Sequence, residues 1–234
     1  CAPIGNINLK IRVYPSDTII LAAGSNANEV VCDGTPLTNV VYNIGGGARG
    51  ASVQFFNGAG APIATPTGLS GNFTAPNVFT ISGTPNVAIT ETTSYTYVVT
   101  TSGNNAGASP NIIPQTCAPA ATITGTITVL PIESITPAVQ ANSTQTTCYG
   151  VDITPIVLTI VGSNTFASVL APSVLPSGMQ FSFVPDADGM GGVVSITGSP
   201  DAVITTQTVY TFTVTTGPVG NTSICADDTE IITI

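Results

Sequence analysis

Histidine and tryptophan are absent from the 234 residues, and the only basic residues are Lys10, Arg12 and Arg49. Twelve acidic residues bring the formal net charge to -9, so we expect the surface to repel a nucleic-acid backbone. The lack of histidine excludes the common mixed Cys/His zinc sites and a Ser-His-Asp triad. The sequence also has no Walker-type loop and no paired carboxylates at matched positions. We therefore expect neither nucleic-acid binding nor enzymatic activity.

Long apolar segments and strong helix formers are scarce as well. No apolar run approaches the about 18 to 20 residues that span a bilayer, so we expect no membrane insertion. Charged residues make up only 6% of the chain, and Thr, Ser, Asn and Gly occupy the polar positions instead. The 24 Gly and 18 Pro residues interrupt the sequence every few positions. This composition predicts an all-β protein with almost no helix.

The five cysteines are widely spaced and contain no CxxC pair. Such spacing favours disulfide bonds over a metal site, and disulfides form in oxidising compartments. We therefore expect the protein to be extracellular, or to lie at the cell surface.

The chain contains two copies of one repeat. "CAPIGNINLKIRVYP" (1–15) recurs as "CAPAATITGTITVLP" (117–131), and the next cysteine follows 31 residues later in both copies. Further along, "ISGTPNVAITETTSYTYVVTT" (81–101) matches "ITGSPDAVITTQTVYTFTVTT" (196–216) at 11 of 21 positions. Similarly, "CDGTPLTNVVYNI" from Cys32 matches "CYGVDITPIVLTI" from Cys148. A repeat of this length predicts tandem domains.

Each copy has an early cysteine, Cys32 or Cys148, and a late cysteine just before its last strand, Cys117 or Cys225. We predict one disulfide within each copy, Cys32 with Cys117 and Cys148 with Cys225. Each bond would tie the closing strand to the body of its own domain.

Cys1 is then the late cysteine of a repeat whose body is not in the sequence. We expect residues 1–14 to be the closing strand of an upstream domain, with Cys1 unpaired or bonded to another domain. Two other interpretations remain: Cys1 is the lipidated first residue of a mature lipoprotein, or the sequence has been cut at an arbitrary point.

Period-2 alternation indicates the strands. In the second closing strand Ile123, Gly125, Ile127 and Val129 alternate with four threonines. We expect further strands near 18–22, 28–32, 37–44, 52–56, 77–82 and 94–101, separated by Gly, Pro and Asn turns. Seven short strands in about 115 residues are typical of an immunoglobulin-like (Ig-like) β-sandwich. We predict Ig-like domains at 15–131 and 132–234.

Two further features repeat. The stretches "GTP" (83–85) and "GSP" (198–200) each separate an apolar strand from a tyrosine-rich one, which predicts a turn between sheets. The alternate aromatic positions Tyr95/Tyr97 and Tyr210/Phe212 share one face of a strand, and we expect them to pack in a core or at its rim.

The motifs "LPSGM" (175–179), "ITGSP" and "YTFTVTT", together with the late cysteine, resemble the Ig-like repeats of very large cell-surface adhesins of the Bacteroidota, including SprB-like gliding-motility adhesins. The resemblance implies export, and long surface filaments that grip substrata or polysaccharide. The first copy departs from this pattern, because "NGAGAPIATPTGLSG" (57–71) stands where the "LPSGM" hairpin is expected.

Two charged features are candidate sites. In "PDADGMGG" (185–192), Asp186 and Asp188 flank a Gly-rich turn like part of a calcium loop, although a solvated hairpin tip explains the same residues. From Ile132 onward there are eight acidic residues and no basic one, whereas Lys10 and Arg12 lie on one face of the first strand. That asymmetry favours head-to-tail docking of subunits by strand addition; a covalently linked upstream domain is the alternative.

The sequence therefore predicts a structural and adhesive segment of a long extracellular filament, whose partners are neighbouring repeats or subunits. The alternative is a carbohydrate-binding, lectin-like module that uses loops at one end of each sandwich. An accessory domain of an exported enzyme is a weaker possibility.

Overall fold

The computed structural model describes residues 15–102, 120–162, 167–169, 174–187, 191–201, 205–216 and 225–234. Strands dominate these ranges, and the single helical element in them is the 3-10 turn η1 (Gln140–Ser143). The predicted all-β class is confirmed. Among these residues, none of the helical structure is long and apolar enough to cross a membrane.

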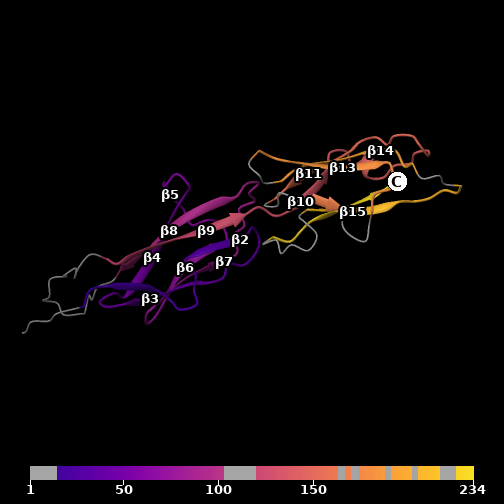
Figure 1. The fold of residues 1–234 in the computed structure, drawn as a ribbon. Coiled ribbons are helices and arrows are strands. Elements are labelled where there is room, and N and C mark those ends of the chain that lie inside the picture. Colours follow the sequence, from indigo (N-terminus) through magenta and orange to yellow (C-terminus); the bar gives the residue numbers. More distant parts are fainter. Residues whose placement is uncertain are drawn as a thin grey trace, which may run out of the picture. The chain divides into compact units, whose positions relative to one another are not determined.

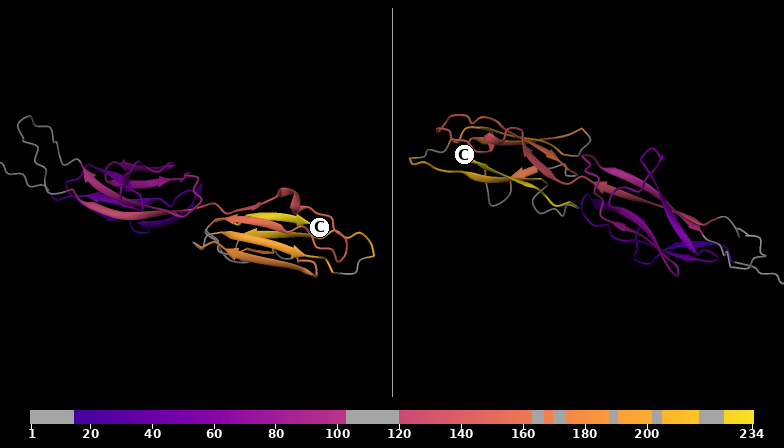
Figure 2. Two further views of the ribbon diagram at one scale, coloured as in Figure 1. Left: turned by 90° about the horizontal axis from the view of Figure 1, so that it is seen from above. Right: turned by 180° about the vertical axis from the view of Figure 1, so that it is seen from behind.

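The strands between residues 18 and 130 form two sheets, which we call the N-terminal sandwich (Figure 1). One sheet has the order β1-β3-β7-β6 and the other the order β2-β9-β8-β4-β5. The bounds are β1 (Thr18–Leu21), β2 (Asn28–Cys32), β3 (Val40–Gly45), β4 (Gly50–Phe56), β5 (Pro62–Ile63), β6 (Leu69–Thr74), β7 (Val78–Gly83), β8 (Thr93–Ser102) and β9 (Thr122–Leu130). Figure 2 shows the strands in layers. Strand β9 alternates as predicted, because Gly125, Ile127 and Val129 are buried and the residues between them are more exposed.

Strands β2 and β9, which are neighbours in the second sheet, run in the same direction. The amide of Thr126 donates to the carbonyl of Ala27, and the amide of Asp33 donates to the carbonyl of Leu130, both at 2.9–3.0 Å. Residue numbers increase together along β2 and β9, so the pair is parallel. The end of β2 therefore lies beside the end of β9.

A hydrogen-bonded tyrosine pair lies at the centre of the N-terminal sandwich. Tyr42 of β3 and Tyr97 of β8 come from opposite sheets, are fully buried, and place their hydroxyl oxygens 2.8 Å apart. The Tyr97 hydroxyl donates to the carbonyl of Ala27 at 2.8 Å, so it accepts from Tyr42. A Cβ at Gly125 would stand 2.2 Å from the Tyr97 hydroxyl oxygen, so that glycine makes room for the phenol.

Burial raises the pKa of the Tyr42 phenol above its ordinary value of 10.0, and the hydrogen bond to Tyr97 opposes that shift. The phenol is therefore neutral at physiological pH, as its donor role requires.

The strands between residues 134 and 233 form the C-terminal sandwich, with sheets β10-β11-β14-β13 and β12-β15-β16. The bounds are β10 (Ser134–Pro137), β11 (Ile156–Val161), β12 (Ala167–Val169), β13 (Met179–Pro185), β14 (Gly192–Gly198), β15 (Thr211–Thr216) and β16 (Thr229–Thr233). Both sheets contribute to its core, in which Phe212 is the one aromatic residue among the described buried side chains. At the positions that match Tyr42 and Tyr97 this core has Leu158 and Phe212, and Ile232 lies opposite Phe212 in the ladder.

The two copies share a tight turn that the sequence analysis missed in the first copy. The amide of Leu69 donates to the carbonyl of Pro66 at 3.0 Å, and that of Met179 to the carbonyl of Pro176 at 3.2 Å. The glycine before each donor has a positive φ, 86° for Gly68 and 85° for Gly178. "PTGL" therefore makes the same turn as "PSGM", and the predicted departure of the first copy from the pattern is wrong at this point.

The "GTP" and "GSP" stretches link strands of different sheets, as predicted, because β7 and β8, like β14 and β15, belong to different sheets. In both copies the proline carbonyl accepts a backbone hydrogen bond from the glycine two residues after the early cysteine. Gly34 donates to Pro85 at 2.7 Å, and Gly150 donates to Pro200 at 3.0 Å.

The chain divides into two compact units whose limits differ from those of the sequence copies. The first unit contains 15–28, Thr38–Gly83 and the described part of Tyr95–Thr126; the second contains Glu29–Leu37, Thr84–Ser94 and the described part of Ile127–Ile234. Independent folding of 15–131 and 132–234 remains a prediction.

Candidate functional site

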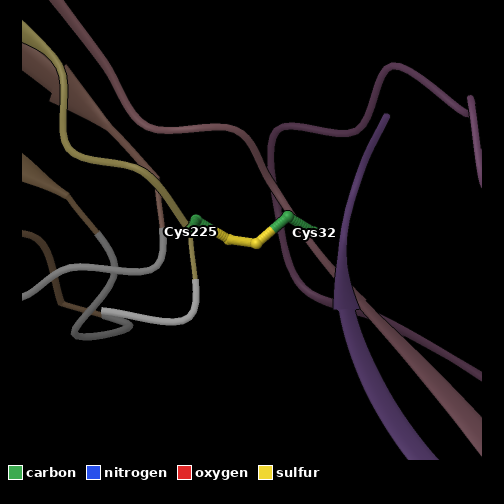
Figure 3. The surroundings of a disulfide bond; sticks show 2 residues. All are labelled: Cys32 and Cys225. Carbon is green, nitrogen blue, oxygen red and sulfur yellow. A yellow bond between two sulfur atoms is a disulfide. The ribbon is translucent and has the colours of Figure 1, made fainter. Parts of the chain in front are cut away.

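A disulfide bond between Cys32 and Cys225 is the main covalent feature of the second unit (Figure 3). The two Cα atoms are 5.6 Å apart, and 193 positions separate the residues in the sequence. Both side chains are buried, Cys32 at the last position of β2 and Cys225 just ahead of β16. The bond joins the first sequence copy to the second.

Hydrogen bonds donated by backbone amides hold the chain next to both cysteines beside one short segment, residues 130–135. The amide of Asp33, next to Cys32, donates to the carbonyl of Leu130 at 2.9 Å. The amide of Ile135 donates to the carboxylate of Asp228, three residues after Cys225, at 2.9 Å. These contacts place the early cysteine of the first copy and the late cysteine of the second within bonding distance.

The carboxylate of Asp33 holds the loop that precedes β8. Its two oxygens accept hydrogen bonds from the amides of Val87 at 3.0 Å and Ala88 at 2.9 Å. Ala88 has a φ of 49°, a conformation that an alanine adopts only when its surroundings impose it. Asp33 is itself buried, so its carboxylate oxygens need such donors in place of water.

The predicted pairing of Cys32 with Cys117 and Cys148 with Cys225 is wrong. Because β2 and β9 are parallel, Cys32 lies beside Leu130 at the end of β9, whereas Cys117 precedes the start of β9. Cys32 is instead bonded to Cys225, and their Cα atoms are 5.6 Å apart, within the about 7 Å that a disulfide permits. Cys117 lies outside the described residues.

The same geometry holds in the second copy. Thr144 and Thr233 form a parallel bridge, so the chain after Thr144 runs alongside β16 toward its end. Cys148 therefore lies beyond the end of β16, and Cys225 precedes its beginning. Cys148 is exposed and free. The two copies thus present one early cysteine in a buried bond and one as an exposed thiol.

The remaining predicted site residues are not brought together by the described structure. Asp186 is exposed at the end of β13, where its amide approaches the carbonyl of Gly191 at 3.3 Å, and Asp188 lies outside the described residues. Lys10, Arg12 and Cys1 also lie outside them. Within the ranges that are described, no three His, Cys, Asp or Glu side chains form a group that could hold a metal ion. Calcium binding stays a prediction.

The role of Asp33 was not predicted from the sequence. The signal was a difference between the copies: "CDG" in the first becomes "CYG" in the second, so the carboxylate is present only where the early cysteine is bonded. A matched pair of buried acids was also not predicted. Asp17 follows Pro15 by two residues, and Glu133 follows Pro131 by two residues.

The chain matches no protein-family model, and no curated protein matches it. Among solved structures it is similar to the I-band fragment I67–I69 from titin, with a TM-score of 0.53 and 14% sequence identity over 91% of this chain. This chain spans 63% of that fragment. The structure of Rst D1-D2 aligns with a TM-score of 0.49 and 11% identity over 92% of this chain and 97% of the other. At such low identity the likeness to the titin fragment shows the Ig-like β-sandwich fold alone.

Proposed function

We propose that this chain is a structural, load-bearing segment of an extracellular adhesive filament built from tandem Ig-like repeats. The observation that carries the proposal is the Cys32–Cys225 disulfide, because it joins one sequence copy to the next. A bond within a single sequence copy would constrain that copy alone. A bond between copies limits how far the tandem chain can extend.

Three further properties support this proposal. A buried disulfide points to an oxidising compartment, and therefore to the outside of the cell or its surface. The tandem repeat and the low charged fraction fit a spacer segment better than a protein that binds nucleic acid or inserts into a membrane. The motifs that resemble SprB-like gliding-motility adhesins add a cell-surface filament, with neighbouring repeats as partners and polysaccharide or a substratum as its target.

Mechanical extension tests the load-bearing role directly. When the two ends of the oxidised protein are pulled in a single-molecule experiment, the 193-residue separation between the bonded cysteines cannot lengthen. We expect the C32S variant to gain up to about 650 Å more extension, at about 3.4 Å per residue. The matched control is C148S, which removes a free thiol and should extend like the unchanged protein. Equal extension of C32S and the oxidised parent would contradict the proposal.

A glycan array separates this proposal from the lectin-like alternative. A spacer segment should bind no glycan, so specific binding by the full chain would favour the carbohydrate-binding module instead.

A further inference from the structure

The hairpin loop between β4 and β5 contains an Asn-Gly sequence, Asn57–Gly58, which occurs nowhere else in the 234 residues. The carbonyl of Asn57 accepts a hydrogen bond from the amide of Gly60 at 2.9 Å, and the amide of Asn57 donates to the carbonyl of Ala61 at 3.0 Å. Residues 57–60 therefore form a β-turn whose first residue is asparagine, a position that asparagine favours. Gly58 has no positive φ, so the turn itself does not require a glycine there.

The side-chain amide of Asn57 is held by its oxygen. Oδ1 accepts hydrogen bonds from the amides of Ala59 at 3.1 Å and Ala61 at 2.9 Å. Two donors at one atom identify that atom as the oxygen of the side-chain amide. The same donors stabilise negative charge on Oδ1 when a nucleophile adds to Cγ, as the donors of an oxyanion hole do. Among the described residues Nδ2 has no hydrogen-bond partner, so nothing there retains it as a leaving group.

The amide nitrogen of Gly58 can attack that carbon, because the attack closes a five-membered ring. Residues 57–60 are exposed, and within the described part of the chain the Gly58 amide donates to no acceptor. A Cβ added at Gly58 would meet nothing within 4 Å, so no neighbouring group blocks the approach. The glycine, which has no side chain of its own, leaves its nitrogen unshielded.

The related sequence Asp33–Gly34 lies in the opposite environment. The amide of Gly34 donates to the carbonyl of Pro85 at 2.7 Å, and the carboxylate of Asp33 is buried. Both carboxylate oxygens accept from the backbone amides of residues 87 and 88. The nucleophile and the side chain are therefore both engaged at Asp33–Gly34, whereas the nucleophile is free at Asn57–Gly58.

We propose that Asn57–Gly58 is a self-modification site, at which asparagine converts to isoaspartate and aspartate. The Gly58 nitrogen bonds to Cγ of Asn57 and gives its proton to water, while the Nδ2 group takes up a proton and leaves as ammonia. Water then opens the cyclic imide at one or the other of its carbonyls. The net reaction consumes one water and releases one ammonia, and it needs neither an oxidant nor a second protein. This inference is independent of the proposed function.

The two products have different consequences for the hairpin. Aspartate at position 57 retains a side-chain oxygen for the amides of Ala59 and Ala61, so the turn is kept. Isoaspartate adds one carbon to the main chain inside the turn that sets the register of β5 against β4. Strand β5 is the edge strand of its sheet and is only two residues long. We therefore expect β5 to detach in the isoaspartate form, which leaves β4 as an open edge for another strand.

Peptide mapping of the full chain after incubation at mildly alkaline pH tests the modification, with fragmentation that distinguishes isoaspartate from aspartate. We expect Asn57 to convert at least as fast as in the free peptide of residues 54–63. Exposed Asn26 and Asn72, each followed by a residue with a side chain, serve as internal controls and should remain asparagine. Slower conversion of Asn57 in the folded protein than in the peptide would overturn the proposal.

The variant G58A tests the role of the exposed nitrogen. The added methyl group has room and needs no positive φ, so the hairpin should be kept. The same methyl group shields the nitrogen, and we expect most of the conversion at Asn57 to be lost. Equal conversion in G58A and the unchanged protein would refute attack by this nitrogen.

Hydrogen exchange over residues 54–63 tests the effect on the sheet edge. We expect faster exchange in the isoaspartate form, purified by ion exchange, than in the unchanged protein. The control N57D adds the same charge without lengthening the main chain, so its exchange should match that of the unchanged protein. Equal exchange in N57D and the isoaspartate form would contradict the opening of the edge.

Discussion

The cores of the two sandwiches have different side chains at matched positions of one layer. The N-terminal core has Tyr97 beneath Gly125, and the phenol occupies space that a side chain at 125 would fill. The C-terminal core has Phe212, without a hydroxyl, opposite the fully buried Ile232. The aromatic residue and its neighbour on the closing strand therefore vary together. The comparison shows that the same layer is packed with a buried hydroxyl pair in one copy and with apolar side chains alone in the other.

The copies differ in the same way at their early cysteines. Cys32 is bonded and buried, with Asp33 beside it holding the neighbouring loop, whereas Cys148 is a free thiol beside the exposed Tyr149. Position in the repeat alone does not decide the state of the cysteine.

The largest effect is expected from substituting the bonded early cysteine, Cys32, and little effect is expected from substituting the free one, Cys148. C32S should lower the free energy of unfolding by about 2 to 5 kcal/mol, because it removes a constraint on the unfolded chain. C148S should change it by less than about 0.5 kcal/mol, since an exposed free thiol is replaced. Urea unfolding followed by circular dichroism measures both, and equal losses would contradict the difference between the two cysteines.

A smaller loss of stability is expected from adding a side chain at Gly125, next to the Tyr97 hydroxyl. The added methyl group of G125A would meet the Tyr97 hydroxyl oxygen at 2.2 Å and the carbonyl oxygen of Ala27 at 2.3 Å, so we expect a loss of about 1 to 3 kcal/mol. Combining G125A with Y97F should recover part of that loss, because the hydroxyl is gone while the carbonyl remains. A double-mutant cycle on thermal unfolding measures the coupling, and additive losses would show that the two residues do not share this space.

The smallest effect is expected from alkaline pH and is confined to the N-terminal core. The pKa of Tyr42 is raised by burial, so above pH about 10 the unfolded chain loses this proton while the folded chain keeps it. Stability should therefore be complete below that pH and fall as the pH rises toward the folded-state pKa. Y42F should reduce the fall. The C-terminal core has Leu158 at the matched position, so L158M should leave the pH dependence unchanged.

The fold class could be predicted from the sequence because apolar and polar residues alternate along a strand as its two faces alternate between core and solvent. The strand at 122–130 has its buried and outward residues where the pattern of isoleucines and threonines placed them. Strand β6 was missed, since "LSGNFT" is short of β-branched residues and contains a glycine, and only pairing with β7 makes it a strand.

The disulfide could not be predicted from cysteine spacing. Equal spacing in two copies says where each cysteine lies in its own copy, but several pairings satisfy it. The missing information was the parallel direction of β2 and β9, which puts Cys32 near Leu130 at the end of β9. The hydrogen bond between the two tyrosines could not be predicted from the sequence either. The alternation of residues along the strand placed Tyr97 on the inner face, but its hydrogen bond depends on Tyr42 in the other sheet.

Disulfide mapping of the non-reduced, alkylated protein tests the central claim most directly. A protease that cuts after acidic residues suits this chain, because it places the four cysteines of the two copies in separate fragments. We predict that the fragment with Cys32 is linked to the fragment with Cys225 and that Cys148 is alkylated. A link between the fragments with Cys32 and Cys117, or between those with Cys148 and Cys225, would contradict the account.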